Sequence, residues 1–263
     1  MSNRVFAVRY AHRATARRSE NFYGPPDPHD GPMPMDYFIW AIAGDEGVVV
    51  VDTGFLPEVG DRRGRTTTAD ASQVLTAVGA APQDVRDVVL THFHYDHAGG
   101  LSLFPNARFW VQQQEMAFWT GPYASRPSIK HSIESADIVE LVRCNYDGRL
   151  RFLDGDGAVA PGISLHRVGG HAPGLQVARV ETRDGAVLLA SDATHYYENL
   201  QTDRPFGVVH SLPDMYAAFD RLCALVPSPA DIVPGHDPLV RERYPAVSPD
   251  LDGFAVEIRA GAT

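Results

Sequence analysis

Short apolar runs, each ended by glycine, proline or charged residues, dominate the hydrophobic pattern of this chain. Two such runs, residues 37–43 and 48–51, are joined by the polar turn Gly44–Gly47 and predict adjacent core strands. Residues 87–90 and 108–111 form two further runs of strand length. The first half of the chain therefore predicts four strands.

The second half of the chain repeats this pattern. Apolar runs at residues 163–168, 176–181 and 186–190 predict three strands, and residues 231–233 predict a short last strand. Three segments predict helices instead, and these are residues 69–78, 115–119 and 215–225. Strands in clusters with helices between them indicate an α/β protein in which two packed sheets carry helices on their outer faces.

Two segments resemble insertions on this core, which we predict to be one domain over residues 1–263. Five prolines stiffen residues 21–36, so this segment cannot form a central strand. The second segment, residues 121–143, has a helical pattern in its latter half. Binding residues often lie in loops on a rigid scaffold. Five apolar side chains therefore either wall a substrate pocket or pack in the core: Met33, Met35, Tyr37, Trp119 and Tyr123.

One motif, H-x-H-x-D-H, carries most of the candidate chemistry. It places four metal-binding side chains within six positions: His92, His94, Asp96 and His97. The apolar residues 88–90 precede it and Ala98-Gly99-Gly100 follow, which predicts a buried strand, a loop and then a helix. Along an extended loop His92, His94 and Asp96 point one way, and His97 turns aside at the helix start. Such a cluster can hold two metal ions side by side.

Three more ligand candidates follow strand-like runs, namely His171, Asp192 and His236. Glycine directly precedes His171 and His236. Glycine allows tight turns and close approach of the backbone at a crowded centre. Each candidate is a weak signal alone, but together with the H-x-H-x-D-H motif they indicate a metal centre at the ends of several strands.

The order of these candidates, H-x-H-x-D-H and then His, Asp and His, resembles the metallo-β-lactamase superfamily. Asp52-Thr53-Gly54 is similar to the D-T-G loop of that family. Within the superfamily the chain most resembles the N-acyl-homoserine lactonases, at residues 91–100, 169–174, 191–193 and 198–199. The resemblance covers nearly the whole chain. It implies a four-layer αββα sandwich of two mixed β-sheets with helices on the outer faces.

The resemblance also implies a ligand set for two divalent transition-metal ions. One ion would be held by His92, His94 and His171, the other by Asp96, His97 and His236, and Asp192 would bridge them. Imidazole and carboxylate ligands without thiolate suit zinc, cobalt, manganese or iron, and zinc is the ion that we expect. Asp52 and, with less support, Asp237 are candidates to orient a ligand histidine from behind.

The chemistry of such a site predicts a hydrolase. Two metal ions about 3.5–4 Å apart can share one water and lower its pKa toward 7, and the resulting hydroxide attacks an acyl carbon. We therefore expect an enzyme that opens a lactone ring, either of an N-acyl-homoserine lactone or of a related cyclic ester. Asp96 and Asp192 would belong to its catalytic residues as well as to its metal ligands.

The chain departs from the lactonase pattern at one position. In that family a tyrosine three residues after the bridging aspartate donates a hydrogen bond to the lactone carbonyl. Here that position is His195, and Tyr196 and Tyr197 follow it. Either His195 is the donor or proton shuttle, or Tyr196 replaces the family tyrosine from the next position, or neither contacts the substrate. His195 and Tyr196 are thus catalytic candidates, and the substrate's acyl or ring group stays open.

Composition supports an enzyme acting on a small molecule. The 263 residues are 44% hydrophobic, and no run approaches 18 apolar residues, so we expect no membrane span. Cys144 and Cys223 lie outside any C-x-x-C motif, and the first residues lack an apolar signal segment, which favours a reducing cytoplasm. A net charge of −10 argues against nucleic acid as a partner. A homodimer is left open.

Several other functions are compatible with parts of this sequence pattern. A thioester hydrolase of the glyoxalase II type shares the ligand set, but only residues 237–263 follow the last ligand, too few for that family's helical domain. A non-catalytic metal-binding scaffold or sensor is disfavoured by the complete ligand set. A mononuclear iron oxygenase would not need Asp96 or His236. β-Lactams are disfavoured as substrates because Asp192 stands where such enzymes often have cysteine.

Overall fold

A computed structural model of the chain describes residues 3–25 and 28–261, so part of the proline-rich segment, Pro26 and Asp27, lies outside the described residues. The first sheet has eight strands in the order β13-β1-β2-β3-β5-β6-β7, with β4 paired to β1. Their bounds are β1 (Arg4–Arg13), β2 (Met35–Gly44), β3 (Gly47–Val51), β4 (Thr66–Thr67), β5 (Asp87–Val89), β6 (Arg108–Gln112), β7 (Leu150–Leu153) and β13 (Ala255–Ile258). The sheet is mixed, because β3, β5, β6 and β7 are parallel and the other pairs are antiparallel.

The second sheet has five strands in the order β12-β11-β10-β9-β8. Their bounds are β8 (Gly157–Ala160), β9 (Ile163–Arg167), β10 (Gln176–Thr182), β11 (Gly185–Ser191) and β12 (Ile232–Pro234). It is also mixed, since β11 and β12 are parallel and the other neighbours are antiparallel.

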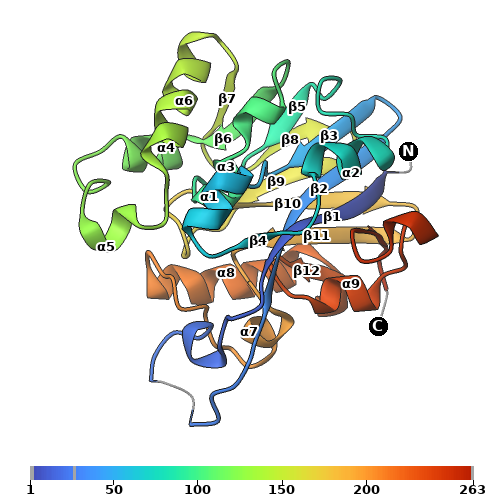
Figure 1. Cartoon of the computed structure of the whole chain (residues 1–263). Coiled ribbons are helices and arrows are strands. Elements are labelled where there is room, and N and C mark those ends of the chain that lie inside the picture. Colours follow the sequence, from blue (N-terminus) through green and yellow to red (C-terminus); the bar gives the residue numbers. More distant parts are fainter. Residues whose placement is uncertain (1–2, 26–27, 262–263) are drawn as a thin grey trace.

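Helices cover both outer faces of this pair of sheets (Figure 1). The α-helices are α1 (Pro57–Arg62), α2 (Ala71–Ala77), α3 (Tyr95–Ala98), α4 (Gln113–Trp119), α5 (Pro127–Lys130), α6 (Ser135–Tyr146), α7 (Tyr197–Gln201), α8 (Leu212–Leu225) and α9 (Leu239–Arg243). Short 3-10 turns occupy Arg18–Glu20, Leu101–Leu103, Pro229–Asp231 and Pro249–Leu251. The four-layer αββα sandwich of two mixed sheets is thus confirmed.

Three apolar clusters lie between the four layers and explain why they stack. In β1, Phe6 and Val8 face the cluster beneath α2 and α6, whereas Val5 and Ala7 face the cluster between the two sheets. Alternate residues of a strand point to opposite faces, so one strand contributes to both clusters. The third cluster packs α8, through residues such as Met215, against the outer face of the second sheet. Burial on both faces is what a sheet covered by helices requires.

The hydrophobic pattern did not predict five of the strands, β1, β4, β7, β8 and β13, and β4 has only two residues. In β1 the residues from Val5 to Ala11 are buried except Arg9, so the apolar and polar alternation of a half-exposed strand is absent. Arg9, the one cation within this run, forms an ion pair in which its Nε lies 2.7 Å from Asp36 Oδ1. Strands β7, β8 and β13 have only four residues each, too few for a clear period.

The topology gathers the ends of several strands at one edge of the sandwich. Strands β9 and β11 are both antiparallel to β10, and β12 is parallel to β11, so these three run in the same direction. Their carboxyl ends therefore lie at one edge of the second sheet. In the first sheet β3 and β5 are parallel and also end together. The candidate ligands follow β5, β9, β11 and β12. Among the described residues, no helix has the length and apolar character needed to cross a membrane.

Candidate metal centre

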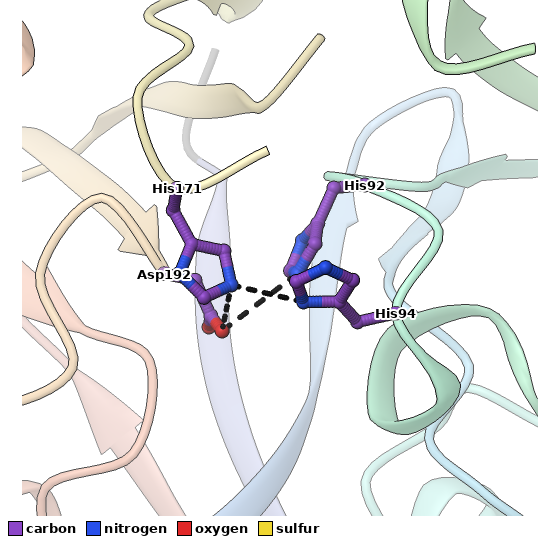
Figure 2. Close-up of side chains that lie close together, drawn as sticks. All are labelled: His92, His94, His171 and Asp192. Atoms are coloured by element: carbon purple, nitrogen blue, oxygen red, sulfur yellow. Dashed lines mark hydrogen bonds and ion pairs between the residues drawn. The ribbon is translucent and has the colours of Figure 1, made fainter. Parts of the chain in front are cut away.

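Four buried side chains from three strand ends point toward one another (Figure 2). His92 and His94 follow β5, His171 follows β9, and Asp192 follows β11. His171 Nε2 lies 2.9 Å from His94 Nδ1 and 3.1 Å from Asp192 Oδ2. His92 Nε2 lies 3.7 Å from the same carboxylate oxygen. The structure thus places nitrogens of His92 and His171 near one oxygen of Asp192, with His94 beside His171.

A second group lies on the other side of the same carboxylate. It contains Asp96, His97 and His236. His97 Nε2 lies 3.1 Å and His236 Nε2 3.0 Å from Asp192 Oδ1, and His236 Nε2 lies 3.9 Å from Asp96 Oδ2. Each oxygen of Asp192 therefore faces a different group of potential ligands. A carboxylate in that position can bridge two metal ions.

The local backbone explains how one short motif reaches both groups. His94 has extended backbone angles and caps α3, which begins at Tyr95. Asp96 and His97 therefore lie in a helical turn and not in the extended loop that the sequence pattern predicted for Asp96. The change from extended to helical backbone turns their side chains away from His92 and His94. As a result Asp96 and His97 join His236 in the second group.

The inner nitrogens of the imidazoles fit metal ions as ligands. Among the described residues, His92 Nε2 is buried without a hydrogen-bond partner, and His97 Nε2, although 3.1 Å from Asp192 Oδ1, is not oriented for a hydrogen bond with it. Buried polar atoms are normally satisfied, so two orphaned nitrogens aimed at one carboxylate indicate an ion as their partner. Burial, followed by neighbouring imidazoles, holds the pKa values of His92 and His94 well below the usual range. Both rings are therefore neutral and carry the lone pair that a metal needs.

The outer nitrogens of three of these rings are held by fixed acceptors. His97 Nδ1 lies 2.7 Å from Asp52 Oδ2. The Nδ1 atoms of His171 and His236 each lie 2.9 Å from a backbone carbonyl oxygen, of Val208 and Asp36 respectively. Such acceptors fix the ring orientation and direct the inner nitrogen toward the candidate site. The fold and this His/Asp cluster together support two divalent metal ions.

Unusual backbone conformations occur directly beside the ligands. Asp52 and Ser191 are two of the three non-glycine residues with positive φ among the described residues, at 64° and 46°. Asp52 directly follows β3, and Ser191 is the last residue of β11. Backbone strain of this kind is concentrated at functional sites. Gly235 lies very close to Asp192, and a Cβ at this position would be only 3.0 Å from Asp192 Oδ1. The expectation that glycine before His236 permits close approach agrees with this geometry.

A buried carboxylate that sequence reasoning missed joins the two loops of the first group. Glu115, in α4, accepts hydrogen bonds from Phe93 N at 3.0 Å and Gly174 N at 2.6 Å. It also accepts one from Trp119 Nε1 at 2.9 Å, and the Trp119 ring packs against that of His94. Burial raises the pKa of this carboxyl above its usual value. A single glutamate near a helix start carries no sequence signal for this role.

The structure separates the two candidates for carbonyl binding. His195 is buried, its Nε2 lies 3.0 Å from Asp192 Oδ2, and its ring stacks on Phe206 with 3.5 Å between centroids. Burial lowers the pKa of His195 to about 3, so its imidazole is neutral. The Tyr196 hydroxyl instead accepts a hydrogen bond from Asn21 Nδ2 at 2.9 Å and lies 3.2 Å from Pro34 O. His195 thus faces the candidate ligands, and Tyr196 faces the 21–36 loop.

Two cavities adjoin the candidate ligands. One, of about 220 Å³, lies over both groups and is lined by Met35 and Tyr37 among others. The second, of about 340 Å³, is mainly apolar and is lined by Trp119 and Tyr123. His94 and His171 line both cavities.

Two further side chains singled out from the sequence lie outside these cavity walls. Met33 packs against the apolar cluster beneath α2 and α6. Asp237 accepts hydrogen bonds from Tyr197 N at 3.0 Å and Leu239 N at 2.9 Å, so it holds the start of α9. The candidate that orients a ligand histidine is therefore Asp52.

Comparison with known proteins agrees with this geometry. The sequence profile of the metallo-beta-lactamase superfamily matches residues 33–236. An N-acyl homoserine lactonase of Bacillus sp. is 30% identical over 190 residues, which cover 66% of this chain and 70% of that protein. The N-acyl homoserine lactonase AttM of Azorhizobium caulinodans is 30% identical over 236 residues, which cover 80% of this chain and 84% of the relative.

Solved structures show the same fold. An N-acyl homoserine lactone hydrolase, with the product N-hexanoyl-L-homoserine bound at its catalytic metal center, superposes with a TM-score of 0.74. The match covers 92% of this chain and 96% of that one at 23% identity. The chain therefore belongs to the metallo-β-lactamase superfamily and, within it, to the N-acyl homoserine lactonase family of metal-dependent hydrolases.

Proposed function

We propose that this protein opens a lactone ring, of an N-acyl-homoserine lactone or a related cyclic ester, with two zinc ions as cofactors. The observation that carries the proposal is the position of Asp192, whose two carboxylate oxygens face separate groups of histidines. The names of its relatives, N-acyl homoserine lactonases, support the choice of a lactone. Nitrogen and oxygen ligands without thiolate support zinc.

The ligand residues divide between the two ions as their positions suggest. His92, His94 and His171 would hold one ion, Asp96, His97 and His236 the other, and Asp192 would contact both. When bound, two such ions supply an activated water and neutralise negative charge that develops on the substrate. Asp52 keeps His97 in the orientation that directs its Nε2 inward.

His195 is the side chain that we assign to the substrate carbonyl. Its neutral imidazole keeps one N–H donor, and its ring lines the same cavity as Asp192 and His171. Its Nε2 lies 3.0 Å from Asp192 Oδ2, so this donor would turn to the substrate carbonyl once Asp192 holds the metal ions. Stacking on Phe206 holds the ring in place, so the donor is oriented before the substrate binds. Donors fixed in a site that excludes water contribute more than donors in solution.

The apolar cavity explains how an acyl chain would fit beside the lactone. It shares His94 and His171 with the cavity over the candidate ligands, so the two cavities adjoin. Phe118, Trp119 and Ile129 contribute apolar wall to it. A ring over Asp192 would thus place a hydrocarbon tail against these side chains, where burial of apolar surface favours binding.

A substrate screen tests the proposed reaction. Purified protein loaded with zinc should hydrolyse N-acyl-homoserine lactones or simple γ-lactones, with proton release as the measured signal. The same protein should act at least about tenfold more slowly on acyl thioesters and on β-lactams. Faster hydrolysis of thioesters than of any lactone would show that the substrate assignment is wrong, while the metal centre would stand.

Substitution of His195 tests the proposed hydrogen-bond donor. His195→Ala should lower kcat by at least about tenfold with both metals retained, since removal of one oriented donor costs on the order of 10²–10³. Tyr196→Phe should leave kcat within about threefold and instead lower the unfolding temperature, because the lost bond connects Asn21. Steady-state kinetics and elemental analysis of both variants provide the test. The opposite pattern would give the donor role to Tyr196.

A further inference from the structure

The cavity over the candidate ligands has a cationic wall that the proposed function does not use. Arg13, Arg63 and Arg65 line it together with Tyr95. Two of these cations are neutralised by ion pairs. Arg13 Nη2 lies 2.9 Å from Glu20 Oε2, and Arg63 Nε lies 2.8 Å from Glu134 Oε1.

Arg65 differs from its neighbours because its partners carry no charge. Its Nε donates to Tyr95 Oη at 3.0 Å and its Nη1 donates to the carbonyl oxygen of Arg63 at 2.7 Å. No carboxylate within the described residues lies within ion-pair distance of it. A guanidinium has five N–H donors, so three donors on Nη1 and Nη2 remain for a ligand. These two nitrogens form the fork that binds a carboxylate with two parallel hydrogen bonds.

Arg65 lies where a charge without a partner costs free energy, which a bound anion would offset. Its side chain is half-buried, and burial lowers its pKa, but Tyr37, Tyr95 and Asp96 raise it, so the net pKa lies above the usual value. Arg65 therefore stays charged. The one carboxylate among these neighbours, Asp96, faces His236 and is a candidate metal ligand, so its charge is used there. Partly buried charges are normally paired.

We propose that Arg65, with the Tyr95 hydroxyl beside it, binds an anionic group of the substrate, so that the preferred lactone carries a carboxylate. The proposal rests on the proposed lactonase function. Tyr95 directly precedes Asp96, so the anion would bind on the side of the Asp96 and His236 group. An N-acyl-homoserine lactone is itself neutral. A carboxylated lactone would use both the candidate metal centre and Arg65.

Two lactones of equal size test the proposal, γ-butyrolactone-γ-carboxylate and the corresponding γ-carboxamide. The zinc-loaded protein should show a kcat/KM at least about tenfold higher for the carboxylate, as a charge-assisted pair predicts. Arg65→Gln should remove this preference mainly through KM and leave the carboxamide rate within about threefold. Arg65→Lys should keep part of the preference, because it retains the charge but loses the fork. Arg62→Gln, an exposed change outside the cavity wall, is the matched control and should keep the preference in full.

Each outcome separates this proposal from the proposed function. Equal rates of the wild-type protein on both lactones would overturn the anion site and leave the lactonase assignment intact. Equal loss of both rates in Arg65→Gln would also overturn it, since a structural role does not depend on substrate charge. If the wild-type protein hydrolyses neither these two lactones nor any N-acyl-homoserine lactone, the proposed function fails. A shift in unfolding temperature with the carboxylate but not the carboxamide, present in wild type, smaller in Arg65→Lys and absent in Arg65→Gln, then still decides the anion site.

Discussion

Asp192→Ala should abolish turnover and release most of the bound metal. Asp192 is buried, and its two oxygens face the two groups of histidines at 3.0–3.1 Å. Loss of a group that merely orients a ligand lowers metal affinity or activity about 10–100-fold, and loss of the bridging ligand itself should exceed this. The wild-type protein, purified without chelator, should hold close to two divalent transition-metal ions per chain by elemental analysis, and the variant clearly fewer.

A matched control separates metal loss from general damage. Asp184→Ala removes an exposed aspartate at the opposite end of the same hairpin and should change neither metal content nor kcat. Circular dichroism and thermal unfolding would show whether Asp192→Ala remains folded. A folded Asp192→Ala protein with wild-type activity would contradict the bridging role, and an active wild-type protein without metal would contradict the whole assignment of the site.

Glu115→Ala should destabilise the protein and weaken metal binding together. The carboxylate accepts from Phe93 N, Gly174 N and Trp119 Nε1 in the interior. Each donor left unsatisfied costs on the order of 1–3 kcal/mol, so we expect a loss of about 3 kcal/mol or more in the free energy of unfolding. The loops that carry His92, His94 and His171 would also lose their common anchor. Metal affinity should therefore fall about 10–100-fold, as for other residues that orient ligands.

Two companion variants make the role of Glu115 testable. Glu115→Gln keeps the size and one acceptor oxygen, so its losses should lie between those of wild type and alanine. Gln113→Ala changes an exposed residue of the same helix, α4, and should leave both quantities unchanged. Denaturant unfolding of the metal-free proteins and competition with a chelator measure the two effects. Lower stability with unchanged metal affinity would limit Glu115 to a structural role.

The sequence was most informative where function demands particular residue types at short spacing. The H-x-H-x-D-H motif and the single residues His171, Asp192 and His236 lie together in the structure because each follows a strand that ends at the same edge. The positions of eight strands along the chain could also be inferred from apolar runs, but not their order in the sheets. The resemblance to a family supplied the division into two ligand groups, which local periodicity alone does not give.

The remaining features depend on contacts between distant residues. Thr91 Oγ1 lies 2.9 Å from Ser191 Oγ, one hundred positions later in the chain. No local sequence pattern predicts that contact. Glu115, Arg65 and the Asn21 contact of Tyr196 are of the same kind. Strand β1 was not predicted for a different reason. Burial on both faces removes the alternation of apolar and polar residues that identifies a strand. The structure shows β1 through its pairing with β2, β4 and β13.

The origin of the ligands in both sheets has a consequence for biosynthesis. A growing polypeptide presents His92, His94, Asp96 and His97 well before His236, which follows β12. Strand β12 pairs in parallel with β11 and must fold back past α8 to do so. Domains generally fold as units during synthesis. The nascent chain therefore offers only part of its ligand set to cellular metals until β12 is made, so we expect complete metal loading only after β12 has paired with β11.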